Sequence, residues 1–438
     1  MNLTIHRGTN EIGGSCVELR SQGKSLLLDI GTPLVNADRT RFDAAKLDRP
    51  VAQLLADKLL PDIPGLYGDG PCDVVGIVLS HAHLDHYGLG HYVRPDVPVY
   101  ASKGTEAIIN VSKVFLPNPT DIANLVLLPD RWQPMQIGPF TVTTYPVDHS
   151  APDAVAVEVE ADGHKVFYSG DLRAHGRKAK LFEHLVQRPP RDVDALLMEG
   201  SSIGRGPTEY PYPDEAAVEQ AIVEEIADSG NLALLFCSSQ NLDRIVTAFK
   251  AAKRTGRFLV IDLYTAYVHH MLQSLSSNIP QYSWEGVRVK YWKHHQEALA
   301  RAGLEGFDMA VRRSGHGIKI DEVMDRRGEI LMLAKANSLF PRLVNPCRLP
   351  SRDGLKLIWS MWRGYLEGEQ YVKPFCDEHG LELKHIHTSG HASVDDLKRL
   401  AQAIHPKRLV PIHTFHPDEY EQFGAPVHRL LDGEPLLV

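Results

Sequence analysis

The chain has 438 residues, of which 43% are hydrophobic and 23% charged, the composition of a globular protein too long for one ordinary core. Its apolar runs stay short of the roughly 20 residues that cross a bilayer, and its five scattered cysteines never form Cys-x-x-Cys, which excludes a disulfide framework and a zinc ribbon. The net charge of −8 argues mildly against a nucleic-acid partner because phosphate contacts need Lys and Arg.

The first 200 residues alternate short β-rich runs with turns, whereas from Asp214 strands and helices alternate regularly. Several early runs are almost continuously apolar, as in sheets covered on both faces. In the first part we expect strands at 15–19, 25–29, 74–79, 97–100, 140–145, 154–160, 164–169 and 195–198, and helices at 105–114 and 181–187. In the second part we expect strands at 232–237, 257–262, 329–334, 355–361, 383–387 and 408–412, and helices at 214–228, 241–255, 369–379 and 395–404. This alternation indicates a parallel α/β arrangement.

The most informative segment is His81-Ala82-His83-Leu84-Asp85-His86, which directly follows the apolar run 74–80. Imidazole and carboxylate are the donors that bind zinc and related divalent ions. His81 and His83 can point the same way, whereas Asp85 and His86 open a second face, which suits two neighbouring ions better than one closed structural site. The cluster predicts a metal site, and its His-x-His-x-Asp-His pattern after a hydrophobic strand resembles the motif of the metallo-β-lactamase fold hydrolases.

That resemblance gives roles to three further residues at strand ends. Asp29 resembles the carboxylate that orients metal-binding histidines, although alone it would equally be a surface turn residue. His149 lies where the fold places its next histidine ligand, with Asp148 as the neighbouring alternative. Asp171, in Ser-Gly-Asp, resembles the bridging carboxylate.

The resemblance implies two divalent ions per chain, which we expect to be Zn²⁺, with Mn²⁺ as the alternative. His81, His83 and His149 would hold one ion, Asp85 and His86 the other, and Asp171 would bridge them. Such a pair can share a hydroxide near neutral pH and clamp a phosphate. The second ion still lacks one ligand.

Three later residues resemble the motifs of the β-CASP branch, which are nucleases that include ribonuclease J. These are Glu199 in Met198-Glu199-Gly200, His391 in Gly390-His391-Ala392 and His413 in Ile412-His413-Thr414. The resemblance implies that His413 completes the second ion, and that His391, oriented by Glu199, protonates the leaving 3′-oxygen or stabilises phosphoryl charge. Asp85 is also expected to be catalytic. A histidine at the final motif is the form found in RNA-acting members.

The implied fold class is α/β, a metallo-β-lactamase αββα sandwich with an inserted β-CASP α/β domain. We expect the sandwich to comprise residues 1–205 and 355–438, and the insertion residues 206–354. The chain departs from the family where Thr414 and Phe415 replace Gly-Glu, and where Gly200 follows Glu199 in place of Ser or Thr. We also expect it to lack the C-terminal domain of ribonuclease J and an N-terminal KH domain.

RNA would then be held by these two domains alone. We expect substrate contacts from Ser389, Gly390, Ser238, Asn241 and Arg244, although Ser238 and Asn241 would be explained equally well by helix capping. Further candidates for an RNA grip are Arg244, Lys250, Lys253, Arg254 and Arg257, the aromatic and basic run 290–295, and the run 312–317. A solvated helix face or an ordinary turn is the alternative for each.

These observations predict a cytoplasmic zinc-dependent ribonuclease, in which a two-metal-activated hydroxide hydrolyses RNA phosphodiester bonds as an endonuclease, a 5′-exonuclease or both. The expected partner is single-stranded RNA, and no membrane partner is expected. A homodimer is a further possibility. Two alternatives stay open. One is a hydrolase of a small ester, lactone or nucleotide, and the other is a non-catalytic scaffold subunit of an RNA-processing complex.

Overall fold

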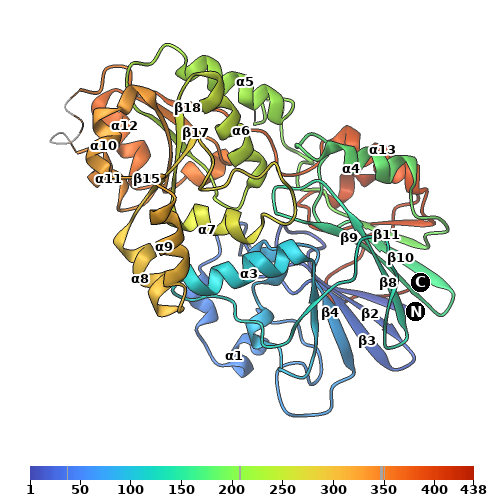
Figure 1. Ribbon diagram of the computed structural model, residues 1–438. Coiled ribbons are helices and arrows are strands. Elements are labelled where there is room, and N and C mark those ends of the chain that lie inside the picture. Colours follow the sequence, from blue (N-terminus) through green and yellow to red (C-terminus); the bar gives the residue numbers. More distant parts are fainter. Residues whose placement is uncertain (37, 207–208, 346–348, 350) are drawn as a thin grey trace. The chain divides into compact units, whose positions relative to one another are not determined.

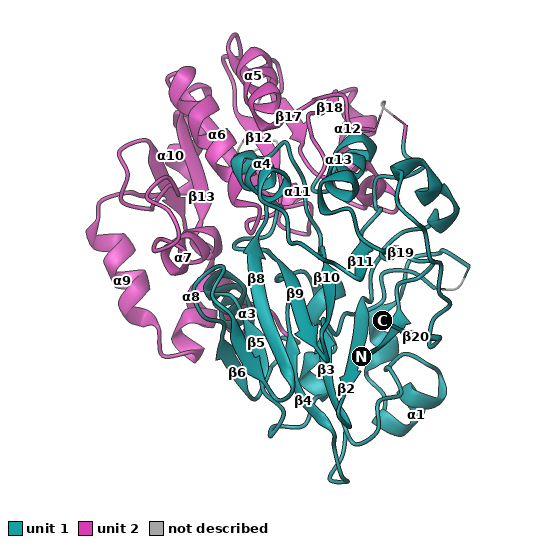
Figure 2. Ribbon diagram, turned by 90° about the vertical axis from the view of Figure 1, so that its right-hand side faces the viewer, with its two compact units in different colours: residues 1–113, 118–205, 390–438 teal, residues 114–117, 206–389 magenta. Residues whose placement is uncertain are grey.

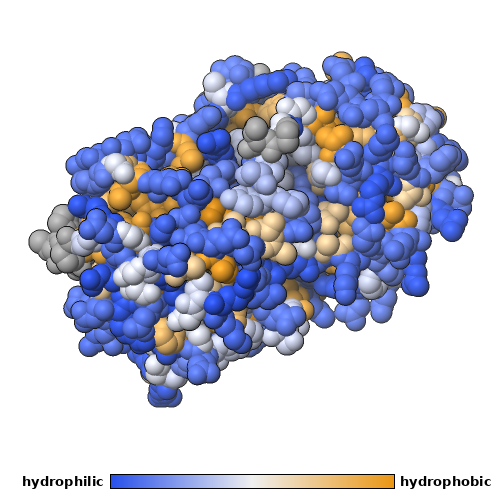
Figure 3. Space-filling view, turned by 90° about the horizontal axis from the view of Figure 1, so that it is seen from above, coloured by the Kyte–Doolittle hydropathy of each residue, from blue (hydrophilic) through white to orange (hydrophobic). Residues whose placement is uncertain are grey.

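The computed structural model describes residues 1–36, 38–206, 209–345, 349 and 351–438, which form two compact units (Figures 1 and 2). Unit 1 comprises residues 1–113, 118–205 and 390–438, and unit 2 comprises residues 114–117 and 206–389. Within those described ranges no helix is both long and apolar enough to cross a membrane. Figure 3 shows one face of the molecule, where hydrophilic residues surround small groups of apolar ones.

Unit 1 contains two sheets. The first has the strand order β20-β1-β2-β3-β4-β5-β6, with β1 (Asn2–Arg7), β2 (Cys16–Ser21), β3 (Lys24–Leu28), β4 (Val74–Val78), β5 (Val99–Ala101), β6 (Leu125–Leu127) and β20 (Pro435–Leu437). The second has the order β19-β11-β10-β9-β8-β7, with β7 (Met135–Ile137), β8 (Phe140–Pro146), β9 (Val155–Ala161), β10 (His164–Tyr168), β11 (Ala195–Met198) and β19 (Arg408–Pro411). The α-helices are α1 (Val51–Ala56), α2 (Leu84–Tyr87), α3 (Lys103–Phe115, whose last two residues belong to unit 2), α4 (Ala179–Gln187) and α13 (Val394–Ile404).

The core of unit 1 lies between the two sheets. Buried Leu26, Leu28 and Val78 of the first sheet pack in one cluster with Val157 and Leu197 of the second. On its other face the second sheet packs against α4 and α13 through a second buried cluster (Figure 2). Because β4 and β11 are covered on both faces, their sequences are almost wholly apolar.

Unit 2 is built on one parallel sheet with the order β15-β14-β13-β16-β12-β17-β18. Its strands are β12 (Ala233–Phe236), β13 (Phe258–Asp262), β14 (Val287–Lys290), β15 (Gly317–Ile318), β16 (Ile330–Ala334), β17 (Lys356–Trp359) and β18 (Leu383–His385). Its helices are α5 (Glu215–Ile226), α6 (Leu242–Arg254), α7 (Leu263–Met271), α8 (Lys293–Arg301), α9 (Glu305–Arg313), α10 (Ile320–Asp325), α11 (Phe340–Leu343) and α12 (Val372–His379).

The return to unit 1 differs from the expected boundary at residue 355. The chain re-enters unit 1 at Gly390, because β17 pairs in parallel with β12 and β18 pairs in parallel with β17. The buried side chains of Leu357 and Trp359 belong to the core of unit 2. Residues 355–389 are therefore part of unit 2, and the helix and strand that follow, α13 and β19, belong to unit 1.

Four of the five cysteines lie in the described residues. Cys16, Cys72, Cys237 and Cys376 are free thiols, in agreement with the absence of a disulfide framework expected from their spacing. Cys347 lies outside the described residues.

Candidate metal centre

Six strands of unit 1 end at the same place and carry the candidate ligands on the residues that follow them. In the first sheet, β3 is followed by Asp29 and β4 leads to the segment His81–His86. In the second sheet, β8, β10, β11 and β19 run in the same direction and lead to His149, Asp171, Glu199 and His413 respectively. The two packed sheets therefore bring residues more than 300 positions apart to one edge.

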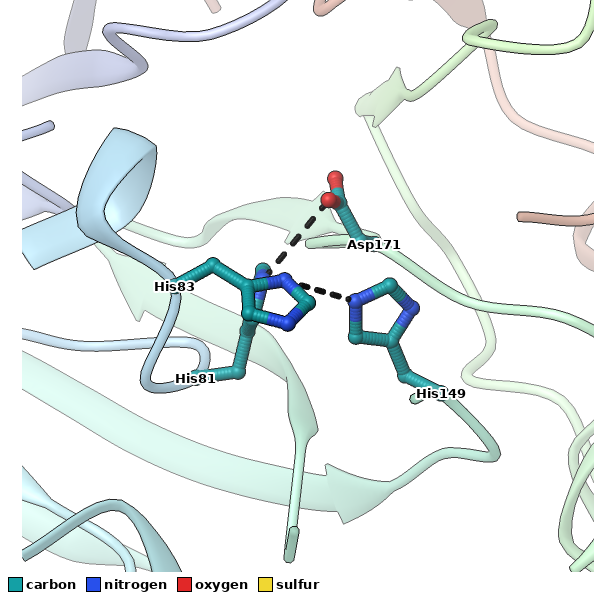
Figure 4. Close-up of side chains that lie close together, drawn as sticks. All are labelled: His81, His83, His149 and Asp171. Atoms are coloured by element: carbon teal, nitrogen blue, oxygen red, sulfur yellow. Dashed lines mark hydrogen bonds and ion pairs between the residues drawn. The ribbon is translucent and has the colours of Figure 1, made fainter. Parts of the chain in front are cut away.

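His81, His83, His149 and Asp171 form the first group (Figure 4). His83 Nδ1 lies 3.1 Å from His81 Nε2 and 3.1 Å from His149 Nε2, and His81 Nε2 lies 3.6 Å from Asp171 Oδ2. A ring nitrogen has one proton or one lone pair in the ring plane, so His83 Nδ1 cannot satisfy two imidazoles as hydrogen-bond partners in the way that a shared cation can.

Asp85, His86, Asp171 and His413 form the second group. Asp171 Oδ2 lies 3.2 Å from His86 Nε2 and 3.7 Å from His413 Nε2, and Asp85 Oδ2 lies 3.8 Å from each of those two nitrogens. Asp171 thus belongs to both groups, and His413 lies where the second group needed one more ligand.

Both groups fit a divalent cation. Donors bound tetrahedrally at about 2.0–2.1 Å lie about 3.3–3.4 Å from one another, which is close to the distances found here. His86 Nε2, His413 Nε2 and Asp171 Oδ1 are buried without a hydrogen-bond partner among the described residues, an arrangement that is unfavourable unless a ligand satisfies these atoms. The donor set of imidazoles and carboxylates suits zinc or manganese.

Burial sets most of these histidines in the form that binds metals. It lowers the pKa of His81 and of His149 well below the usual value, an effect that neighbouring imidazoles reinforce. It also lowers the pKa of His83 and of His413. These rings are therefore neutral near pH 7, and a neutral ring offers the lone pair that a cation needs.

In His86 and His149, the ring nitrogen that faces away from the ligand groups contacts an oxygen atom of the protein. Asp29 Oδ2 lies 2.7 Å from His86 Nδ1 and accepts hydrogen bonds from Ser80 Oγ and Tyr168 Oη. His149 Nδ1 lies 2.7 Å from the carbonyl oxygen of Gly390. Contacts of this kind fix the tautomer and orientation of a metal-binding imidazole.

His391 lies beside the second group and is oriented by a carboxylate. Its Nδ1 is 2.9 Å from Glu199 Oε2 and 3.8 Å from Asp171 Oδ2. Glu199 is itself held by the backbone N–H groups of Leu172 and Ser201. Burial acts to lower the pKa of His391, but the carboxylates of Glu199 and Asp171 outweigh it, so the pKa is raised. His391 can therefore carry a proton near neutral pH.

A buried ion pair that the sequence did not reveal supports the loops that carry His149 and Asp171. Arg173 and Asp148 are fully buried, with Arg173 Nε 3.3 Å from Asp148 Oδ1, and the backbone N–H of Arg173 donates to the carbonyl of Asp148. Lys178 Nζ donates to the carbonyl oxygen of His149. Asp148, which we weighed as a ligand, thus contacts Arg173, and the Asp-x-Arg spacing after β10 was the available signal.

The expected substrate-binding residues are dispersed. Gly390 belongs to unit 1, whereas Ser389, Ser238, Asn241 and Arg244 belong to unit 2. Asn241 caps α6, its side chain accepting from the backbone N–H of Arg244, and Ser238 is exposed.

Arg244 is fully buried and lies inside a network in unit 2. Its guanidinium binds Glu215, Ser360 and His387. This environment gives Arg244 a structural role in unit 2.

Comparison with known proteins relates the chain to families of metal-dependent hydrolases. The β-lactamase superfamily domain matches residues 48–217, and the Zn-dependent metallo-hydrolase RNA specificity domain matches residues 380–417. Ribonuclease J of Sinorhizobium meliloti is 25% identical over 87% of this chain and 66% of its own length. Ribonuclease J of Mycobacterium tuberculosis is 22% identical over 94% of this chain and 68% of its own. The chain thus spans about two thirds of the length of these relatives.

A solved structure supports the architecture. A protein of unknown function from Enterococcus faecalis superposes with a TM-score of 0.76 at 22% identity, covering 100% of this chain and 99% of that one. With the superfamily match, the paired sheets and the second α/β unit, the fold is the α/β fold expected from the resemblance, a metallo-β-lactamase sandwich with an inserted β-CASP domain.

Proposed function

We propose that this chain, which is a ribonuclease J-like protein of the β-CASP branch of the metallo-β-lactamase fold, is a metal-dependent ribonuclease. The observation that carries the proposal is the pair of ligand groups that share Asp171, with His391 beside them. The match to an RNA specificity domain around His391 and His413 supports RNA as the substrate.

His81, His83, His149 and Asp171 would hold one divalent ion, and Asp85, His86, His413 and Asp171 the other, both of which we take to be zinc. Bound there, two ions supply a nucleophile near neutral pH and neutralise phosphate charge. Asp29 keeps the lone pair of His86 directed at its group, and Asp85, 9% exposed, adds negative charge at the second group. Because Asp85 lies in this group, we assign it a catalytic role.

His391 donates the proton to the leaving 3′-oxygen in this proposal. Its side chain is 22% exposed, so substrate can reach it, whereas Glu199 behind it is 1% exposed. Glu199 stabilises the protonated ring and holds Nδ1, which directs Nε2 toward the substrate. The products carry a 5′-phosphate and a 3′-hydroxyl.

Single-stranded RNA is the form of substrate that suits this site. The proposed ligand residues other than His83 are buried, and an unpaired strand can insert a phosphate more deeply than a duplex, whose phosphates line a wide surface. We also propose a cytoplasmic location and a homodimer. Light scattering after size exclusion should give twice the chain mass of 48.8 kDa.

The test is cleavage of a labelled RNA oligonucleotide by zinc-loaded protein and by His83→Ala. The matched control is His164→Ala, which removes a half-exposed imidazole of unit 1 away from the ligand groups. We expect cleavage by wild type and control, 5′-phosphate products, and no cleavage by His83→Ala. Hydrolysis of small esters without RNA cleavage, or equal cleavage by all three proteins, would contradict the proposal.

A further inference from the structure

Unit 2 carries a groove at the carboxyl edge of its parallel sheet, the edge where α/β folds bind ligands. The groove has a volume of about 390 Å³ and is lined by Trp292, Lys293, His294, Leu339, Arg342 and Asn345. We call it the α8 groove. It shares Trp292, His294 and Leu339 with a smaller, deeper pocket that reaches Asp262, His295 and Lys335. A volume of this size is within the range of small-molecule sites.

The charge around the α8 groove is positive. Helix α8 begins at Lys293, its N-cap residue Trp292 makes no side-chain cap, and its first turn contains no acid. The positive end of a helix favours anions, yet Lys293 occupies this turn, and Arg342 in the wall of the groove adds a second cationic side chain. Glu297 pairs with Lys293 at 3.3 Å, but both side chains are exposed, so this pair is weak and can open for an anionic ligand. Cations at an uncapped N-terminus are unfavourable unless an anion neutralises them.

The α8 groove offers an aromatic ring, and the smaller pocket beside it an unsatisfied polar atom. Trp292 is half-buried and borders both cavities, and Lys290 Nζ lies 4.3 Å from the centroid of its ring. His295 Nδ1 is buried without a hydrogen-bond partner among the described residues. Burial lowers the pKa of His295 to about 4, so its ring is neutral at pH 7 and can donate to or accept from a nucleobase.

Asp262, the acid of the deep pocket, is already engaged. Its Oδ1 accepts two hydrogen bonds from Thr265. Burial acts to raise the pKa of Asp262, but Lys335 and these hydrogen bonds outweigh burial, so the pKa is lowered. Its charge is therefore balanced locally, and the open part of the groove keeps its positive character.

We propose that the α8 groove binds one nucleotide of a single-stranded RNA, with the phosphate at the N-terminus of α8 beside Lys293 and Arg342 and the base against Trp292. Aromatic platforms within a basic groove are the common means of holding single strands. This inference rests on the proposed function, because it takes RNA as the ligand, and adds a binding site within unit 2.

Fluorescence anisotropy with a labelled single-stranded oligoribonucleotide tests the site. The background is the metal-loaded chain carrying His391→Ala, so that the RNA stays intact. The test variant is Lys293→Gln with Arg342→Gln, and the matched control is Arg301→Gln with Lys373→Gln, an exposed arginine at the end of α8 and an exposed lysine of α12. Each phosphate contact to a single strand contributes about 0.7 to the slope of log K against log salt. Because both cations contact one phosphate, we expect the test variant to lose about 0.7 from this slope and the control to lose none.

Substitution of the ring gives a second readout. Trp292→Ala should weaken binding about 5- to 150-fold, as loss of one stacked base does, whereas Trp292→Phe should keep most of the affinity. Since Trp292 packs on the core of unit 2, thermal melting identifies any variant that is unfolded, and the surface pair Lys293 and Arg342 then carries the test.

The two proposals fail in different ways. If RNA is bound and wild type cleaves it, but the test variant binds with the slope and affinity of the control variant, the groove proposal alone is overturned. If neither RNA binding nor cleavage occurs while the metal centre still hydrolyses bis(p-nitrophenyl) phosphate, RNA is the wrong substrate and both are overturned.

Discussion

Replacing Glu199 by Gln should move the alkaline limb of the pH–rate profile to lower pH. Glu199 Oε2 lies 2.9 Å from His391 Nδ1, and the carboxylate favours the protonated ring. A Gln amide that keeps the contact with the backbone N–H of Leu172 turns its NH₂ group toward Nδ1, which can accept from it only when that nitrogen is unprotonated. The substitution therefore favours neutral His391.

The size of the shift follows from the distance. Two unit charges 2.9 Å apart interact by about 1.4 kcal/mol at a dielectric constant of about 80 and by about 5.7 kcal/mol at about 20. His391 is 22% exposed, so the solvent-screened end of this range applies. Because 1.36 kcal/mol corresponds to one pH unit in a titration, we expect the alkaline limb to move to lower pH by about one unit.

The sign follows from the role of His391 as an acid. The protonated form is active, so activity is lost as pH rises through the pKa of His391, and a lower pKa moves that loss to lower pH. The assay is kcat/KM on an RNA oligonucleotide across pH for wild type and Glu199→Gln, at equal metal content measured by elemental analysis. A lower rate with an unmoved alkaline limb would refute the assignment of His391 as an acid tuned by Glu199.

Three further substitutions test the supports of the two units. Asp29→Asn should weaken metal affinity or activity about 10- to 100-fold, the usual effect of losing a partner of a metal-binding imidazole; metal titration against a chelator checks this, and unchanged affinity would refute the orienting role. Arg173→Gln should cost about 1–3 kcal/mol in the free energy of unfolding, because buried Asp148 loses this cation and keeps the longer contact with Lys178 at 3.6 Å, and it should weaken metal binding as well. Denaturant unfolding measures the loss, and unchanged metal affinity would show that the pair does not position the ligands. Arg244→Met should cost about 3–5 kcal/mol because it removes the cation that pairs with the buried Glu215 carboxylate, yet leave kcat/KM of the folded protein within about twofold; a large loss of RNA binding in folded protein would restore Arg244 as a substrate contact.

The candidate ligand groups could be predicted from the sequence because their residues are local or follow apolar strands. His81–His86 supplies four donors in one turn, and each remaining ligand follows a run whose burial on both faces makes it conspicuous. The order of these runs does not by itself bring Asp171 within reach of His413. That inference needed the resemblance, and the packed sheets give it its physical basis.

The boundary at which the chain returns to unit 1 and the structural role of Arg244 were harder to predict from the sequence. Strand β17 is an apolar run that would suit either sheet, and only its pairing with β12 decides in favour of unit 2. An Arg near a helix start looks the same in sequence whether it faces a phosphate or Glu215. In both cases the missing information is which distant partner the segment meets.

The account's central claim is a centre of two divalent ions that share Asp171, and metal stoichiometry tests it most directly. Elemental analysis of zinc-loaded protein after removal of loosely bound metal should give two ions per chain. His149→Ala and His413→Ala should each retain about one, and Asp171→Ala should lose affinity at both positions. One ion per chain in wild type, or an unchanged count in His413→Ala, would contradict the claim.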